Sequence, residues 1–136
     1  MAKKPVKKRR ISIRSAKNKS VKMQNAIAQM ISDLTGIKCG KDELIQGREM
    51  GQSGVDVKLI GDAKAAFPFA VEAKDCMQWS IPGWLRQAQS NIGGFDTWLL
   101  FCQRTSRLKN EKISMKVMME ADYFFKLLKE LKELKK

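Results

Sequence analysis

Positive charge is concentrated at one end of this chain, and this limits where a folded domain can begin. Residues 1–22 contain ten lysines and arginines and no acidic residue. The other 114 residues carry 17 basic and 14 acidic groups, so the net charge of +13 divides into +10 and +3. Because like charges repel, we expect residues 1–17 to be a basic arm without a fold of its own. Residues 18–136 are then long enough for one domain.

The basic arm indicates a polyanionic partner, because neutralising phosphates releases the counterions condensed around a nucleic acid. A membrane surface is the weaker alternative, since residues 1–22 contain no aromatic residue and no leucine as an anchor. No apolar run approaches the roughly 20 residues that span a bilayer, so we expect no membrane partner. The expected nucleic-acid contacts of the arm are Lys7, Lys8, Arg9, Arg10 and Arg14.

The composition excludes several classes of enzyme. The chain has no histidine, which rules out a Ser-His triad, a Cys-His nucleophile and a His-ligated zinc site. Its three cysteines are scattered and form no CxxC motif, as is typical of reduced thiols in an intracellular, cytoplasmic protein. The basic N-terminus is not followed by the apolar segment of a signal peptide.

Three segments have helical patterns. Residues 18–35 and the C-terminal segment show the apolar spacing of amphipathic helices, and Gly36 is suited to end the first. Another helix is predicted to begin at Ser80, because serine can cap a helix and Pro82 fits its first turn. The apolar positions of the two amphipathic helices are Met23, Ile27, Met30, Ile31 and Leu34 in one, and Phe124, Leu127, Leu128, Leu131 and Leu134 in the other.

Four segments have strand patterns, and residues 61–66 are predicted to form a turn. Two strands come before the helix at Ser80 and two after it, with room for one further short strand near Leu44–Ile45. The predicted order is α-β-β-α-β-β-α, an α/β domain with a central mixed β-sheet flanked by helices. The strand segments are residues 55–60, 67–74, 97–102 and 113–119.

Two carboxylates and a lysine occupy the first two predicted strands. Glu72 and Lys74 are two residues apart, so both project from the same face of their strand. Pairing of the two strands can bring Asp56 beside Glu72. Two adjacent carboxylates repel, and a divalent cation removes that penalty; ligation by oxygen alone suits Mg²⁺. Lys74 could then orient the attacking water or stabilise charge that develops on a phosphate.

Asp56 followed by Glu72-Ala73-Lys74 resembles the signature of the PD-(D/E)xK nuclease superfamily, with Val55 in place of the proline. The resemblance is specific over about residues 48–91. It implies a restriction-endonuclease-like core, and the nearest group is the phage and archaeal Holliday-junction resolvase-like endonucleases. The implied activity is Mg²⁺-dependent hydrolysis of DNA phosphodiesters in recombination, with Mn²⁺ able to substitute. The implied location is the cytoplasm, that of a host cell for a phage enzyme.

The resemblance also assigns roles to residues. Asp56, Glu72 and the Ala73 carbonyl would bind the metal, and Lys74 would be the catalytic lysine. Gln24 lies on the first helix, where many members carry a glutamate, and a glutamine on the second helix would lie near the site. The implied partner is branched DNA, bound by a homodimer. Further candidates are Gln87 at the site, and Arg48, Ser53, Arg86 and Gln89 as nucleic-acid contacts.

Three alternatives stay open. One is a nuclease of the same superfamily that acts on another DNA structure. Another is a non-catalytic basic nucleic-acid-binding protein, in which Asp56, Glu72 and Lys74 are a surface ion-pair cluster and loss of Glu72 has no effect. The last is an RNase-H-like nuclease, which needs three or four converging carboxylates. The other acids considered for that site match no strand pattern; they are Asp33, Glu43, Asp62, Asp75 and Asp96.

Overall fold

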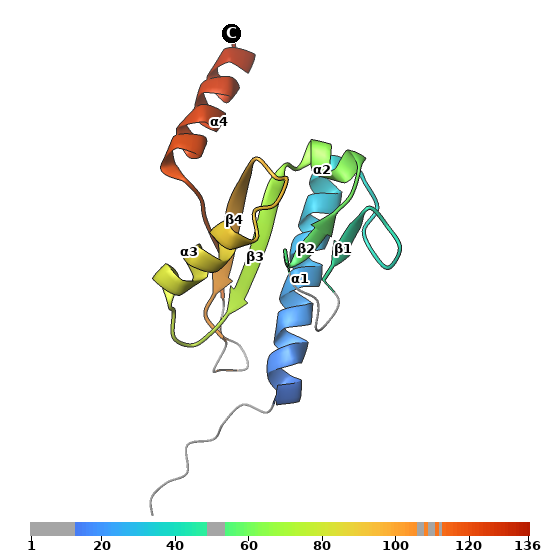
Figure 1. The fold of residues 1–136 in the computed structure, drawn as a ribbon, viewed down its shortest axis with the longest axis vertical. Helices are drawn as coiled ribbons and strands as arrows, with labels where there is room; N and C mark the ends of the chain where they lie inside the picture. The colour runs from blue at the N-terminus through green and yellow to red at the C-terminus, as the bar shows by residue number, and fades with distance from the viewer. Residues whose placement is uncertain (1–12, 49–53, 106–107, 109–110, 112) are drawn as a thin grey trace, which may run out of the picture.

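The fold is a mixed α/β arrangement, seen in a computed structural model that describes residues 13–48, 54–105, 108, 111 and 113–136 (Figure 1). The predicted α/β class is confirmed, and the optional short strand near Leu44–Ile45 is present as β1. The elements in chain order are α1 (Ile13–Thr35), β1 (Ile45–Gly47), β2 (Val57–Leu59), α2 (Asp62–Ala66), β3 (Phe69–Asp75), α3 (Ile81–Ser90), β4 (Thr97–Gln103), β5 (Lys116–Met118) and α4 (Ala121–Leu134).

The strands form two sheets instead of one. The larger sheet has the order β3-β4-β5, with β3 and β4 parallel and β4 and β5 antiparallel, so it is mixed as predicted. The smaller sheet is the antiparallel pair β1-β2. Because β4 is covered on both faces, its sequence is a nearly continuous apolar run, which is typical of a buried parallel strand.

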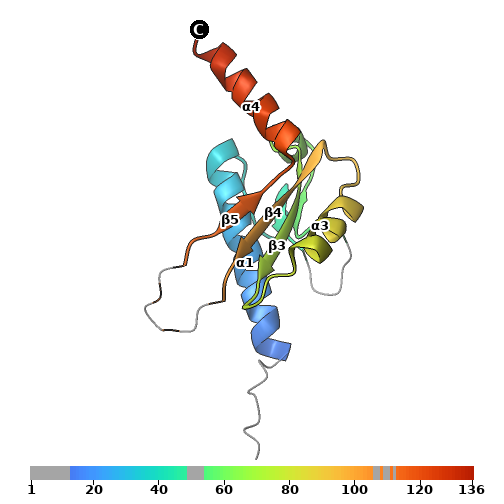
Figure 2. The same cartoon turned by 90° about the vertical axis from the view of Figure 1, so that its left-hand side faces the viewer.

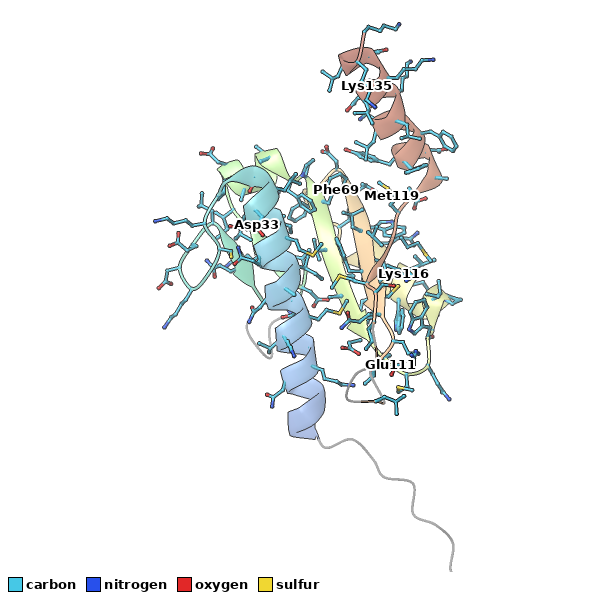
Figure 3. The ribbon with its side chains drawn as sticks, turned by 180° about the vertical axis from the view of Figure 1, so that it is seen from behind. Asp33, Phe69, Glu111, Lys116, Met119 and Lys135 are labelled. Atoms are coloured by element: carbon cyan, nitrogen blue, oxygen red, sulfur yellow. The ribbon has the colours of Figure 1, made fainter. Side chains whose placement is uncertain are left out.

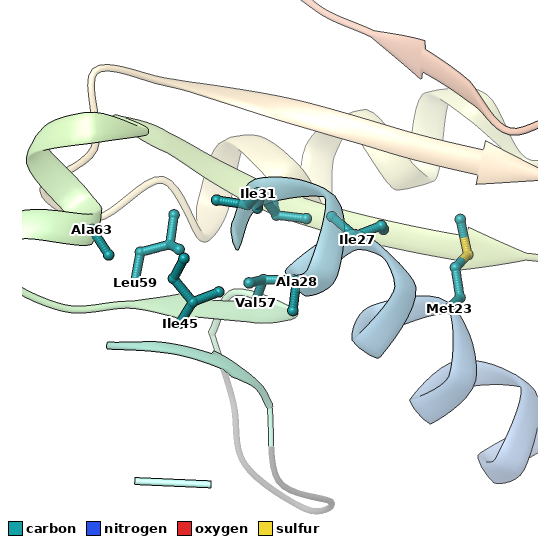
Figure 4. Packing of buried hydrophobic residues seen from close by; sticks show 9 residues of the cluster. Met23, Ile27, Ala28, Ile31, Ile45, Val57, Leu59 and Ala63 are labelled. Atoms are coloured by element: carbon teal, nitrogen blue, oxygen red, sulfur yellow. The ribbon is translucent and has the colours of Figure 1, made fainter. Parts of the chain in front are cut away.

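One hydrophobic core fills the space between α1, the β1-β2 pair and one face of β3 (Figure 4). Met23, Ile27 and Ile31 follow one another at intervals of four along α1 and are all buried. On the strands, Val57 and Val71 are fully buried in the same cluster. The other buried members are Ala28, Ile45, Leu59 and Ala63.

A second core lies on the other face of the β3-β4-β5 sheet, under α3 (Figure 2). Trp84 and Ala88 of α3 pack there against Ala70 of β3 and against Trp98 and Leu100 of β4. The side chains of β3 therefore alternate between the two cores, as its sequence pattern predicts. Glu72 and Lys74 share the face of Ala70, which is the face that α3 covers.

Some predictions about the helices are wrong in detail. The first helix begins at Ile13, so residues 13–17 of the predicted arm are helical. Its buried face is also narrower than predicted, because Met30 and Leu34 are 56% and 75% exposed, while Ala28 is buried. Most of the turn predicted over residues 61–66 is the short helix α2, with Gly61 as its N-cap residue. Gly36 does end α1, with the positive φ of 74° that glycine adopts without strain.

The C-terminal elements pack less than predicted. The strand expected over residues 113–119 is reduced to Lys116–Met118, and Val117 is 55% exposed. The helix α4 forms as predicted, but it projects away from the sheets and none of its residues is buried (Figure 3). None of the helices in the described part of the chain has the length and apolar character needed to cross a bilayer.

Candidate functional site

Backbone hydrogen bonds hold Asp56 beside the middle of β3. The amide of Asp56 donates to the carbonyl of Val71 at 2.8 Å, and the amide of Arg48 donates to the carbonyl of Asp56 at 2.9 Å. Asp56 thus lies between the end of β1 and β3, one residue before β2 begins. This arrangement confirms the prediction that Asp56 and Glu72 come together, although through these bonds and not through a ladder between β2 and β3.

Three groups surround the carboxylate of Asp56, which is 4% exposed. The amide of Ala73 donates to Oδ2 at 2.7 Å. At Oδ1, the guanidinium of Arg48 lies 3.1 Å away and Nε2 of Gln24 donates at 3.3 Å. Gln24, predicted from its place on the first helix, therefore reaches the site. Arg48 therefore lies within the site as well. Its guanidinium also donates a hydrogen bond to the carbonyl of Gly54 at 3.0 Å.

Glu72 is the least satisfied group of the site. Its side chain is 1% exposed, and Oε1 accepts a hydrogen bond from Asn91 at 2.8 Å. Among the described side chains, Oε2 of Glu72 is the only buried nitrogen or oxygen atom without a hydrogen-bond partner. Burial, and secondly the neighbouring charge of Asp56, raise the pKa of Glu72 to about 7, against the lowering effects of Asn91 and Lys74.

Lys74 is held by the helix that covers its face of the sheet. Its ammonium donates to Oε1 of Gln87 at 2.8 Å, so Gln87, and not Gln89, contacts the lysine. The side chains of Gln89 and Arg86 are exposed on α3. Because β3 places Glu72 and Lys74 on one face, α3 supplies a partner to each: Asn91 to the acid and Gln87 to the lysine.

The donor set fits a hard divalent cation. Mg²⁺ is commonly bound by one or two carboxylates, with water and phosphate oxygens completing its octahedron. Glu72 offers an oxygen without a partner. On Asp56, Arg48 and Gln24 occupy both lone pairs of Oδ1, while Oδ2 accepts only the Ala73 amide and keeps one lone pair. In a strand, the carbonyl and the amide of one residue point to the same side. The amide of Ala73 donates to Asp56, so its carbonyl also points towards the side of Asp56. No group of three or more Asp, Glu, His or Cys side chains suited to a metal occurs among the described residues.

A hollow of about 390 Å³ opens beside Lys74, between the end of β3 and the N-terminal half of α1. Lys19 and Ser20 of α1 line it together with Ala73 and Lys74. Lys22 lines an adjacent hollow of about 400 Å³, again with Lys19. Cations of α1 therefore flank the same end of β3 that carries the site.

Several predicted contacts cannot be compared with the structure. Ser53 and the arm residues Lys7, Lys8, Arg9 and Arg10 lie outside the described residues, as does the side chain of Arg14. Conversely, sequence reasoning missed Asn91, the only side chain recorded as donating to Glu72 in the described part of the chain. Asn91 is the C-cap residue of α3, a position where asparagine is common, so its type carried no signal of a second role.

Comparison with known proteins bears on neither the site nor the fold. No protein-family model, no curated protein and no solved structure matches this chain.

Proposed function

We propose that this chain is a Mg²⁺-dependent endodeoxyribonuclease of the PD-(D/E)xK type that hydrolyses phosphodiester bonds. The observation that carries the proposal is the unsatisfied Oε2 of Glu72, an acid 1% exposed and beside a second buried acid. A buried polar atom without a partner costs free energy, and the hydrogen bond from Asn91 satisfies only the other oxygen of this acid. A cation on that oxygen would remove the cost and the repulsion from Asp56.

Each residue of the site has a role in this proposal. Asp56, Glu72 and the Ala73 carbonyl would hold the cation, while Gln24 and Asn91 keep the two carboxylates in place. A bound Mg²⁺ would neutralise charge that develops on the phosphate during hydrolysis. The ammonium of Lys74, fixed by Gln87, would supply a second positive charge near the phosphate.

The distribution of cations supports DNA as the substrate. Lys19, Lys22 and Lys74 line adjoining hollows at the end of β3 together with one acid, Asp75, and residues 1–12 of the sequence add six lysines and arginines. Such a surface attracts phosphates in a salt-dependent way that does not depend on base sequence. Branched DNA, such as a four-way junction, is the narrower proposal, and it rests on the small size of the domain and on the resemblance described above.

A non-catalytic nucleic-acid-binding protein is the second candidate, and one observation favours it. Asp56 already accepts bonds from Arg48, Gln24 and the Ala73 amide, which is how a purely structural acid is satisfied. In that case Asp56 ties β1 to β3, and the basic surface alone accounts for binding.

A cleavage assay separates the two candidates. Labelled four-way junction, linear duplex and single-stranded DNA are each incubated in Mg²⁺ or in EDTA with the wild type, Glu72→Gln and Glu133→Gln. The last variant is a matched control, because Glu133 is an exposed acid on α4, far along the chain from the site. DNA binding by each protein is measured in parallel.

We expect cleavage in Mg²⁺ by the wild type and by Glu133→Gln, and none by Glu72→Gln. Paired, symmetrical cuts on the junction would support the resolvase-like activity, and equal cutting of all three DNAs would retain the nuclease without the preference for branches. Tight binding without cleavage by the wild type, in Mg²⁺ and in a further incubation with Mn²⁺, would contradict the nuclease and favour the second candidate.

A further inference from the structure

The helix α4 carries an apolar face that the described chain leaves mostly exposed, with only Tyr123 and Leu127 half-buried. No residue of this fully described helix is buried. The helix contacts the sheets near its start, where the ring of Tyr123 packs edge-on against the ring of Phe69 with centroids 5.4 Å apart. Beyond that contact the helix projects from the domain (Figures 1 and 3). Leu131 and Leu134 are 47% and 83% exposed. A monomer gains nothing from such a surface, and exposed apolar patches of this kind commonly mark interfaces.

The spacing of the apolar residues is that of a coiled-coil seam. Steps of three, four and three residues connect Phe124, Leu127, Leu131 and Leu134, which makes them positions a, d, a and d of two heptads. Leu128 lies next to the seam at position e. The lysines at 126, 129 and 132 fall at the outward positions c, f and b. A helix pair needs a narrow apolar seam at a and d with polar residues such as lysine at the outward positions. A helix that packs on its own domain needs only a broad apolar face.

We propose that α4 pairs with α4 of a second copy of this chain, with the two helices parallel about a two-fold axis. Charge supports this orientation. In a parallel pair, a residue at g lies across from the e position five residues further along the partner helix. Glu130 is at g and Lys135 follows it by five, so two symmetrical Glu130–Lys135 pairs would flank the seam. An antiparallel pair would instead bring the two Glu130 side chains towards each other.

Charge also argues against the other occupants of an apolar helix face. Residues 120–136, which include α4 and Lys135, carry five lysines and four acids, a net charge of only +1. A helix that lies on an anionic membrane surface has a strongly basic polar face. A second copy needs no such excess, and the seam offers it an identical apolar stripe.

The test measures the mass of the full chain in solution across a range of concentrations, by sedimentation equilibrium at high salt. The monomer has a mass of 15.5 kDa, and we expect the wild type to approach twice that value as its concentration rises. Leu131→Lys places a charge in the seam and should raise the dimer dissociation constant at least about tenfold. Phe125→Lys is the matched control, because Phe125 is 67% exposed at the outward position b. It should leave the dimer unchanged.

The orientation is tested with charge exchanges on the surface, which do not threaten folding. Glu130→Lys and Lys135→Glu should each weaken the dimer, and the two together should restore it. Circular dichroism checks that each variant keeps its helix content. A double variant that fails to recover the wild-type dimer would overturn the parallel arrangement, because in an antiparallel pair the exchange only replaces one like-charge contact with another.

Three results would overturn the pairing itself. They are a wild type that stays monomeric at every concentration, equal effects of Leu131→Lys and Phe125→Lys, and a monomer that binds vesicles of anionic lipid through α4. None of these measurements depends on DNA cleavage, so this proposal can fail while the proposed function stands.

Discussion

Replacing Glu72 by glutamine should stabilise the protein at neutral and alkaline pH when no divalent cation is present. Glutamine keeps the size of the side chain and its acceptor for the amide of Asn91, and it removes a buried charge that faces Asp56. Most substitutions of buried residues destabilise a protein. Stabilisation by this one would therefore identify Glu72 as an acid that the fold accommodates at a cost.

The magnitude follows from the pKa of Glu72, which burial and Asp56 raise from 4.5 to about 7. Below pH 4.5 the carboxyl is protonated in both the folded and unfolded states, so the wild type has no penalty. Between these values the folded state keeps a proton that the unfolded state has lost, so stability falls as pH rises. Above pH 7 the full penalty applies, and the shift corresponds to roughly 3 kcal/mol.

Urea unfolding in EDTA, followed by circular dichroism over a pH series, measures this effect. The advantage of Glu72→Gln over the wild type should be roughly 3 kcal/mol near pH 8, about 1 kcal/mol near pH 5.5, and nearly zero near pH 4. Glu133→Gln, an exposed acid changed in the same way, should show no such trend. A Glu72→Gln protein less stable than the wild type by the same amount at every pH would refute the reasoning.

Three further predictions concern the proposed activity. Lys74→Ala should bind DNA as the wild type does but cleave it far more slowly. A binding assay and the single-turnover cleavage rate measure the two effects. Cleavage at the wild-type rate would remove Lys74 from the mechanism. Asn91→Ala removes a bond that lowers the pKa of Glu72, so the acid limb of the pH–rate profile should move to higher pH; an unmoved limb would contradict this. Removal of residues 1–12, with their six basic groups, should reduce the slope of log affinity against log salt by up to about 5; an unchanged slope would show that the arm does not contact DNA.

The local patterns of the strands were enough to predict the centre of the site. The alternation in residues 67–74 places Glu72 and Lys74 on one face of β3, because a strand has a period of two whatever it packs against. This alternation depends on a few neighbouring residues, and so it is visible in the sequence. Asp56 was predicted to reach Glu72 by pairing of the two strands, but β2 pairs with β1, and a single bond from the Asp56 amide to Val71 brings the two acids together instead.

The partners supplied by distant segments were harder to predict. Asn91 reaches Glu72 because α3 crosses β3 at a particular angle, and no pattern within α3 encodes that angle. The buried face of α1 was predicted too broadly, because Met30 and Leu34 have the spacing of core residues but are largely exposed. Apolar spacing indicates which residues share a face, and not whether another element covers them.

The helix α4 shows the same limit in a stronger form. Its stripe predicts an amphipathic helix correctly, and the natural expectation is that the stripe packs on the domain. The structure leaves it exposed, because the chain leaves β5 in a direction that carries the helix away from both cores (Figure 2). A sequence pattern cannot distinguish a face that packs on its own domain from one that packs on another molecule.

Calorimetric titration of the wild type with Mn²⁺ tests the central claim about the site most directly, in buffers of different ionisation enthalpy. If Glu72 is a ligand, the metal must displace its proton, so binding near pH 7 should release about half a proton per chain and binding near pH 9 almost none. Glu72→Gln should bind the ion much more weakly and release no proton. Saturable binding that is unchanged in Glu72→Gln, or no binding by the wild type, would contradict the account.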